Sequence, residues 1–530
     1  MKSEKIFEAI TEIEDKYIDE ANTEKIRSGK KHFWRWAGGT AACFARAIAV
    51  GIVNNGGLGA AAGGGTNREP GERYMSYAGP AFPLAALEST EGLSFERSIN
   101  FDFSPYYTYQ DSYEDSDGEI VYYDRYNNNA VISDNYTVTN VTGDDIAFTA
   151  VYPFSGSMRT ETERMPQITV DGNAVETELI IGPYSGGFTS AWGENSEVER
   201  LNLSSIESWD EYKILLESGE YMKDAFEENP KMEQNVTVYS FGIEYNVPME
   251  EFDKIDNPDM IVTFDYDTEN SSVYFYGFNS LSWSSEEEWV KVGSYIPKSF
   301  NPDFENHPVF IIVMGDDIDN IDIKTVSDFI EKYDDERVET SAFSVTTEKY
   351  ESTLGEVIFE IISSGDYESH YFDDEPTVRS LISNEEYLGY VAEFMYAHGH
   401  LSEDPAERYF SGRLDDVISE TGYVSRVLYV TFEVTIPAGE TVEIGTKTLR
   451  EASFDFYGAG RDEDMNGFDM VTKLGTDINI TKQTASVSNT EQIDIAYNNF
   501  GFDLKNGITE VLLGDEEHYW MEVVKIYPEE

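Results

Sequence analysis

An apolar stretch at residues 33–53, FWRWAGGTAACFARAIAVGIV, constrains this chain more than any other feature, because it separates two parts of very different composition. The chain has 37 basic and 102 acidic residues, and residues 1–53 contain 9 of the basic and 8 of the acidic ones. Residues 54–530 therefore contain 28 basic and 94 acidic residues, a net charge of −66. Five basic residues crowd the N-terminal flank of the stretch: Lys25, Arg27, Lys30, Lys31 and Arg35. The positively charged flank of a membrane span usually stays in the cytoplasm. We therefore predict a transmembrane anchor at 33–53 that places residues 1–32 in the cytoplasm and the bulk of the chain outside the cell.

The predicted anchor is a marginal membrane span. Residues 36–53 offer barely 18 positions, near the lower limit for crossing a bilayer. Arg46 lies among them and costs about 2.5–3.5 kcal/mol at the centre of the bilayer. Two alternatives therefore stay open. One is a signal peptide cleaved after Ala47-Ile48-Ala49, although its basic region would be unusually long. The other is a lipoprotein attached through Cys43, although the apolar run lies mainly after that cysteine.

Charge and cysteine content exclude several classes of function. A segment of net charge −66 is a poor partner for nucleic acid, because binding requires Lys and Arg to neutralise phosphates. Cys43 is the single cysteine, so the chain can form neither an internal disulfide nor a cysteine-rich zinc site. The sequence has no Gly-x-Ser-x-Gly elbow and no His-Glu-x-x-His motif, the marks of many serine hydrolases and zinc proteases. We therefore expect a protein that is not an enzyme.

The segments around the anchor have distinct patterns. Within residues 1–32, apolar side chains recur at helical spacing, which predicts an amphipathic helix over 3–21: Ile6, Ile10, Ile13 and Tyr17. Such a helix suits a cytoplasmic protein partner, and the alternative is a tail helix that lies on its neighbours or on the bilayer surface. Residues 54–73 are rich in Gly, Ala and Asn and are predicted to form a flexible linker.

Beyond residue 74 the apolar period shifts toward two, which indicates strands. Residues 146–154 carry apolar side chains at alternate positions and follow a strand-like run at 135–140, so we predict that the two form a hairpin. Asp171-Gly172 predicts a second, tighter hairpin turn. We predict a β-sandwich over residues 74–300, with a helical insertion that begins near Ser208.

The remaining chain is divided into two further sections. Residues 309–314 form a continuous apolar run, typical of a buried strand, and helical spacing predicts helices over 326–333 and 350–361. A capping box of Ser383 and Glu386 begins another helix, so residues 301–422 form an α/β and helical section. Residues 428–436 alternate strictly, which predicts a C-terminal β-sandwich over 423–530. The predicted fold class is thus mainly β with α insertions, with two β-sandwich-like domains that flank a helical section.

Several segments resemble membrane-anchored proteins of anaerobic Gram-positive bacteria. The N-terminal part carries FEAI at 7–10 and IEDKYIDEA at 13–21, then a basic run and a Trp-led span, and it is similar to the corresponding part of anti-sigma factors. The outer part shares YMSYAGP at 74–80, IPAG at 436–439 and NFGFD at 499–503. The resemblance implies a single span and a cytoplasmic helix but no particular activity. The chain departs from the family at Arg46, which interrupts a span that is otherwise apolar.

One segment has the pattern of a calcium loop. Asp462, Asp464 and Asn466 alternate and Gly467 follows, as in the first half of an EF-hand loop. Position 12 of that pattern is Lys473 and not the bidentate Glu, so Asp469 would have to supply an oxygen from another direction. The hypothesis is a calcium site at Asp462, Asp464, Asn466 and Asp469. The alternative is an ordinary acidic loop, and we expect no other cofactor.

The function that these patterns favour is binding. We expect a single-pass surface protein whose outer β-rich region senses or binds an extracellular ligand and whose N-terminal helix relays to a cytoplasmic regulator. The alternatives are a carbohydrate-binding or adhesion protein, and a hydrolase that acts on glycans or peptides. Large aromatics near Gly/Ser-rich segments could stack on sugars, although they could equally close the ends of a sandwich: Trp192, Trp283 and Trp289.

Overall fold

The structure is a computed structural model. It describes residues 76–77, 79–114, 120–184, 225, 228–267, 269–284, 289–299, 309–328, 337–364, 376–397, 399–401, 412–424, 426–455, 465–473 and 478–526. The chain divides into two compact units, Met1–Ala61 and Ala62–Glu530, and all described residues belong to the second. The predicted N-terminal helix, anchor and linker therefore lie outside the described residues. Among those residues, no helix has the length and apolarity that crossing a bilayer requires.

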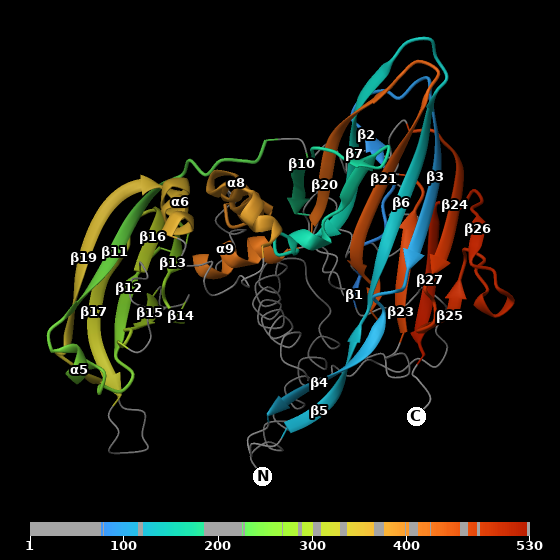
Figure 1. Cartoon of the computed structure of the whole chain (residues 1–530). Coiled ribbons are helices and arrows are strands. Elements are labelled where there is room, and N and C mark those ends of the chain that lie inside the picture. Colours follow the sequence, from blue (N-terminus) through green and yellow to red (C-terminus); the bar gives the residue numbers. More distant parts are fainter. Residues whose placement is uncertain are drawn as a thin grey trace, which may run out of the picture. The chain divides into compact units, whose positions relative to one another are not determined.

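The described residues are mainly β, as predicted, and the largest sheet has seven strands (Figure 1). Its order is β26 (Glu510–Leu512), β24 (Ile480–Ser488), β3 (Leu93–Asp102), β6 (Asn129–Asn140), β21 (Thr441–Glu451), β8 (Gln167–Val170) and β9 (Asn173–Ala174). Only the β24–β3 pair is parallel. Asp171 and Gly172 join β8 to β9 with φ of 49° and 75°, the conformation of a type I′ turn, so this predicted hairpin is confirmed.

Two smaller sheets pack against the seven-stranded sheet. One has the order β10 (Glu178–Tyr184), β20 (Arg426–Ile436), β7 (Ile146–Gly156) and β2 (Ala85–Ala86). The other has the order β1 (Ser76–Tyr77), β22 (Phe454–Asp455), β23 (Met465–Val471), β27 (His518–Lys525) and β25 (Ile493–Asn498). Phe95 of β3 meets Phe148 of the first at 6.2 Å between ring centroids, and Phe103 meets Phe468 of the second at 5.3 Å. The inner face of one large sheet is thus covered by two different sheets.

The strands predicted to form a hairpin at 135–154 do not pair with each other. Although both are fully described, β6 pairs with β21 and β7 pairs with β20, each over eleven residues. The connections after β6 and after β20 therefore cross from one sheet to the other, and the two crossings lie against each other. Asn140 holds them together, because its buried amide donates to the carbonyls of Asp144 and Ile436 at 2.8 and 3.0 Å. The alternation identified the buried faces correctly but not the partners.

This pairing also corrects the predicted domain boundaries. Strands from 423–530 lie in the same sheets as strands from residues 76–184, so these two segments build one sandwich and not two. The predicted boundary at residue 300 falls inside a second sandwich, which is formed by residues 235–353. Pairing between distant segments carries no local sequence signal, and this explains the difference.

The second sandwich consists of two sheets with a shared aromatic core. One has the order β13 (Ser271–Tyr276), β16 (Val309–Gly315), β11 (Asn235–Tyr245) and β19 (Phe343–Thr353). The other has the order β14 (Ser280–Ser284), β15 (Trp289–Tyr295), β12 (Asp259–Asp265), β17 (Asp319–Asp328) and β18 (Arg337–Glu339). A short helix, α5 (Met249–Phe252), precedes β12. Residues 319–328 are a strand, so the helix predicted over 326–333 is wrong for its first three residues; the rest lies outside the described residues.

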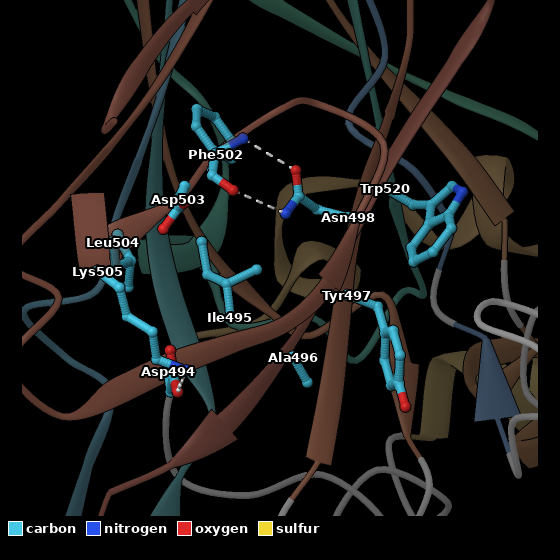
Figure 2. Close-up of a pocket in the computed structure, with 10 residues that line it drawn as sticks. All are labelled: Asp494, Ile495, Ala496, Tyr497, Asn498, Phe502, Asp503, Leu504, Lys505 and Trp520. Carbon is cyan, nitrogen blue, oxygen red and sulfur yellow. Dashed lines mark hydrogen bonds and ion pairs between the residues drawn. The ribbon is translucent and has the colours of Figure 1, made fainter. Parts of the chain in front are cut away.

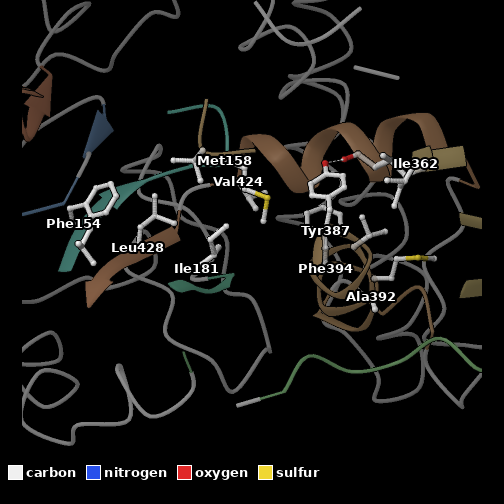
Figure 3. Close-up of a cluster of buried hydrophobic side chains, with 14 of the residues drawn as sticks. Phe154, Met158, Ile181, Ile362, Tyr387, Ala392, Phe394, Val424 and Leu428 are labelled. Atoms are coloured by element: carbon white, nitrogen blue, oxygen red, sulfur yellow. Dashed lines mark hydrogen bonds between the residues drawn. The ribbon is translucent and has the colours of Figure 1, made fainter. Parts of the chain in front are cut away.

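Three helices pack against the outer face of the β13–β19 sheet: α6 (Leu354–Ser364), α8 (Asn384–Ala397) and α9 (Leu414–Tyr423). This explains the continuous apolar run of β16, in which Ile311 and Val313 face the sandwich core while Phe310 and Ile312 face the helices. The predicted buried strand is confirmed. Figure 3 shows part of the buried apolar cluster that contains residues of these helices. Within it, the hydroxyl of Tyr387 in α8 donates to the carbonyl of Ile418 in α9 at 2.5 Å. The predicted Ser383–Glu386 capping box begins α8.

Within the described residues, the remaining elements are a two-stranded hairpin and three short 3₁₀ helices. The hairpin comprises β4 (Tyr107–Glu114) and β5 (Ile120–Asn127), which follow β3 and precede β6 in the chain. The 3₁₀ helices are η1 (Thr162–Arg164), η5 (Val378–Leu381) and η7 (Leu504–Asn506).

Candidate functional site

The NFGFD segment at 499–503 forms a tight turn between β25 and η7. The Asn498 carboxamide oxygen accepts hydrogen bonds from the backbone N–H groups of Gly501 and Phe502 at 2.7 and 3.0 Å, and its amide donates to the carbonyl of Phe502 at 3.1 Å. Gly501 has φ of 97°, which a residue with a side chain rarely adopts. The turn is therefore closed by one side chain and made possible by one glycine.

The same turn is attached to the core and to the neighbouring strand. Phe500 and Phe502 are both buried, with their rings stacked at 4.9 Å. Asn499 continues the pairing with β27 beyond the end of β25, because it donates to the carbonyls of His518 and Trp520 and accepts from the Trp520 N–H at 2.7 Å. This segment thus fixes the position of Trp520 as well as its own.

A pocket of about 410 Å³ lies between this turn, β25 and β27, and its lining residues are drawn in Figure 2. Tyr497 and Trp520 lie on one side of it, and both rings keep exposed surface. Asp494 and Lys505 form an ion pair at 3.2 Å on another side, with the Asp503 carboxylate beside Leu504. The pocket therefore combines two aromatic rings with two carboxylates and one ammonium group.

The Asp503 carboxylate is held in its ionised form. Its pKa lies below the usual value because the side chain and the backbone N–H of Asn506 donate hydrogen bonds to it. The bond from the Asn506 backbone N–H also caps η7. At neutral pH, Asp494, Asp503 and Lys505 together give the pocket a net charge of −1, with carboxylates as acceptors and the ammonium group as donor.

A second polar group lies on the same outer face of the sheet as Trp520. Nε2 of His518 is 2.8 Å from Oδ2 of Asp469, whose side chain is fully buried, whereas the His518 ring is one-fifth exposed. The buried carboxylate therefore fixes the orientation of an accessible imidazole. Glu522, also buried, lies four residues beyond His518 in β27 and is paired in register with Tyr497.

The four predicted calcium ligands are not brought together as far as the structure describes them. Asp462 and Asp464 lie outside the described residues. Asn466 and Asp469 lie in β23 at an odd spacing, so their side chains point to opposite faces. Asn466 accepts from the Tyr106 hydroxyl at 2.6 Å on the core side, while Asp469 meets His518 on the other. The described residues contain no cluster of three His, Cys, Asp or Glu suited to a metal ion. Calcium binding at Asp462 and Asp464 stays a prediction.

No protein-family model matches this chain, and no curated protein matches it. The resemblance to anchored Gram-positive proteins therefore stays a prediction that rests on the motifs themselves.

The sequence analysis named the NFGFD segment as a motif of the resemblance, but it predicted neither the turn nor the residues around it. Asp494, Tyr497 and Lys505 lie within six residues of the turn, whereas Trp520 lies seventeen residues beyond it and is brought there by strand pairing. Of the three tryptophans considered earlier, Trp192 and the side chain of Trp283 lie outside the described residues. Trp289 begins β15 in the second sandwich, away from this turn in both sheet and sequence.

Proposed function

We propose that the outer part of this protein binds carbohydrate, and that the pocket between the NFGFD turn and Trp520 is the binding site. The combination of two accessible aromatic rings with carboxylates and an ammonium group carries the proposal. Aromatic rings stack on the apolar face of a sugar ring, and charged groups accept from and donate to its hydroxyls. The turn supports this role because it holds the ring-bearing strand and the carboxylates in fixed positions before a ligand arrives.

The test is a titration of the protein with soluble neutral oligosaccharides of glucose, N-acetylglucosamine and mannose, followed by calorimetry. Tyr497→Ala and Trp520→Ala should each weaken binding at least tenfold. The affinity of Trp520→Phe should lie between that of Trp520→Ala and that of the wild type. Leu512→Ala removes an even more exposed apolar side chain from the nearby strand β26 and should leave affinity unchanged. Absence of binding to all three sugars, or equal affinity of all variants, would refute the proposal.

We further propose the cellular arrangement that the sequence predicts. Residues 33–53 anchor the chain in the cell membrane, the described residues are extracellular, and residues 1–32 recruit a cytoplasmic regulator. The basic flank and the charge step across 33–53 support this arrangement. Protease treatment of intact cells should remove residues 74–530 but spare an epitope tag at the N-terminus, and the opposite pattern would contradict it.

A second candidate function is glycan hydrolysis, because His518 is accessible and oriented by a buried carboxylate. This is the arrangement of a general base whose tautomer is fixed by its partner. The measurement is the appearance of new reducing ends during prolonged incubation with the oligosaccharides that bind. Loss of product with His518→Gln but retention of binding would support hydrolysis; unchanged oligosaccharides would leave binding alone as the function.

A further inference from the structure

The hairpin of β4 and β5 exposes an unusual number of tyrosines. Within the described part of the chain these two strands pair only with each other, in the register Tyr109 to Arg125 and Asp111 to Tyr123. Residues opposite each other share a face, so one face carries four tyrosines around a central charged pair: Tyr107, Tyr109, Tyr113, Tyr123, Asp111 and Arg125. We call this the tyrosine face. Its four phenol rings are 39–54% exposed, far more than aromatic side chains in a folded protein usually are.

The rings of the tyrosine face do not form a flat platform. Tyr107 and Tyr109 meet at 5.8 Å with an interplanar angle of 56°, and Tyr113 and Tyr123 meet at the same distance with an angle of 61°. Rings at this separation are in edge-to-face contact with each other, so a ligand can meet only their exposed outer faces, which are tilted differently. The geometry therefore favours single flexible side chains that lie on individual ring faces over one sugar ring stacked across several of them.

The charge of the hairpin selects the kind of side chain. Residues 107–127 contain six acidic residues and one basic residue, Arg125, a net charge of −5. Anionic polymers and a second copy of the same hairpin are repelled by this charge. Tyrosine rings attract cations through their negative faces, and a nearby carboxylate strengthens the attraction.

The other face of the hairpin already binds a cation in this way. Lys525 of β27 places its ammonium group 4.5 Å from the ring centroid of Tyr106 and 4.7 Å from that of Tyr126. The same ammonium donates to the backbone carbonyls of Tyr107 and Asn127 at 3.3 and 3.4 Å. The base of the hairpin is thus held by a lysine between tyrosines, which is a local example of the recognition expected on the exposed face.

We infer that the tyrosine face is a docking surface for a basic segment of a partner protein, whose Lys and Arg side chains lie over the exposed faces of these rings. Arg125 and Asp111, paired at 3.2 Å, supply polar contacts at the centre of this surface. The inference is independent of the carbohydrate pocket, because it uses a different sheet and different residues.

The test uses the full-length protein and a fluorescent twelve-residue peptide of alternating Arg and Ser, followed by fluorescence anisotropy at 0.05–0.5 M salt. Because the chain carries a net charge of −65, any polycation binds it weakly at low salt. The comparison that decides is therefore between variants that keep every charge. Tyr109→Ser/Tyr123→Ser should weaken binding about tenfold, as expected for the loss of two exposed cation–π contacts.

The matched control is Tyr245→Ser/Tyr396→Ser, which removes two tyrosines of the same exposure, 39% and 41%, from the second sandwich and from α8. It should bind the peptide as the wild type does. Equal affinities of the two double variants would overturn the inference, and so would a hairpin variant that loses binding to neutral oligosaccharides and not to the peptide. Trp520→Ala should not alter peptide binding, so failure of the carbohydrate proposal would be recognised separately.

Discussion

Arg97 and Asp134 form an ion pair at 2.7 Å in which both side chains are completely buried. The two residues lie on neighbouring strands, β3 and β6, near the place where the two smaller sheets meet. The guanidinium also donates to the carbonyls of Phe82 and Val471, and the Tyr136 hydroxyl donates to Asp134. Burial raises the pKa of Tyr136 well above its usual value, so this hydroxyl keeps its proton. One buried network therefore joins the large sheet to β23 and to the segment that precedes β2.

Removal of one partner of this pair should destabilise the protein strongly. Arg97→Met leaves the Asp134 carboxylate buried without its cationic partner, and Asp134→Asn leaves the Arg97 guanidinium buried without its anionic partner. Each substitution should lower the free energy of unfolding by about 3–5 kcal/mol. Urea unfolding followed by circular dichroism gives the measurement. The control is Glu96→Ala, which breaks an exposed pair with Lys482 on the opposite face of β3 and should cost less than about 1 kcal/mol. A loss below 1 kcal/mol for Arg97→Met would contradict the expectation.

Asp415 should make the stability depend on pH in the direction opposite to most carboxylates. Burial in the first turn of α9 raises its pKa from 3.8 to about 6, although the Gly277 N–H donates to one oxygen at 3.2 Å. The folded state thus binds a proton that the unfolded state releases, and stability rises as pH falls from about 6 to 4. Above pH 6 the buried charge costs about 3 kcal/mol.

Asp415→Asn should remove this cost and keep the acceptor for Gly277. At pH 7.5 the variant should be about 2–3 kcal/mol more stable than the wild type, and the difference should vanish near pH 4. Asp124→Asn, on the exposed strand β5, serves as the control for a general change in charge. A difference that does not change between pH 4 and 7.5 would show that the charge of Asp415 is not the cause.

Asn140 should be essential for the paired crossings between sheets. Asn140→Ala removes the side-chain donor to the buried Ile436 carbonyl and one of the two side-chain donors to the Asp144 carbonyl, which should cost about 1–3 kcal/mol. Val141→Ala, at the adjacent position and 71% exposed, should change stability by less than about 0.5 kcal/mol. Thermal unfolding of the two variants provides the comparison, and similar melting temperatures would argue against this role of Asn140.

Gly501 should be required for its backbone conformation and not for lack of space. A Cβ at this position would meet its nearest neighbour, Val511, only at 3.9 Å, yet φ is 97°. Gly501→Ala should therefore cost about 1–2 kcal/mol through backbone strain and weaken sugar binding with it. Gly143→Ala, at a position with open space and no positive φ, should be nearly neutral. If both glycine variants behave alike, strain in the NFGFD turn is not important.

Several local features could be predicted from the sequence because short-range physics determines them. The Asp171-Gly172 turn follows from backbone conformations that few other residues adopt, and the Ser383–Glu386 capping box from donors at the first turn of a helix. Of the site, the NFGFD segment was named as a motif of the resemblance, but its turn and its role in a pocket were not predicted. The Asp469–His518 contact and the position of Trp520 were not, because strand pairing brings these residues together.

The alternation of apolar residues in the sequence identified strands such as β7 and β20 and one buried face of each. That information lies in the alternation of neighbouring side chains, which responds to burial alone. Tertiary packing sets which strands are neighbours: β20 lies beside β7 and β21 beside β6, although the paired strands come from distant parts of the chain. A period of two specifies a face but not a partner, so one sandwich built from both ends of the described chain, and the pocket at its edge, could emerge only from the packing of the whole.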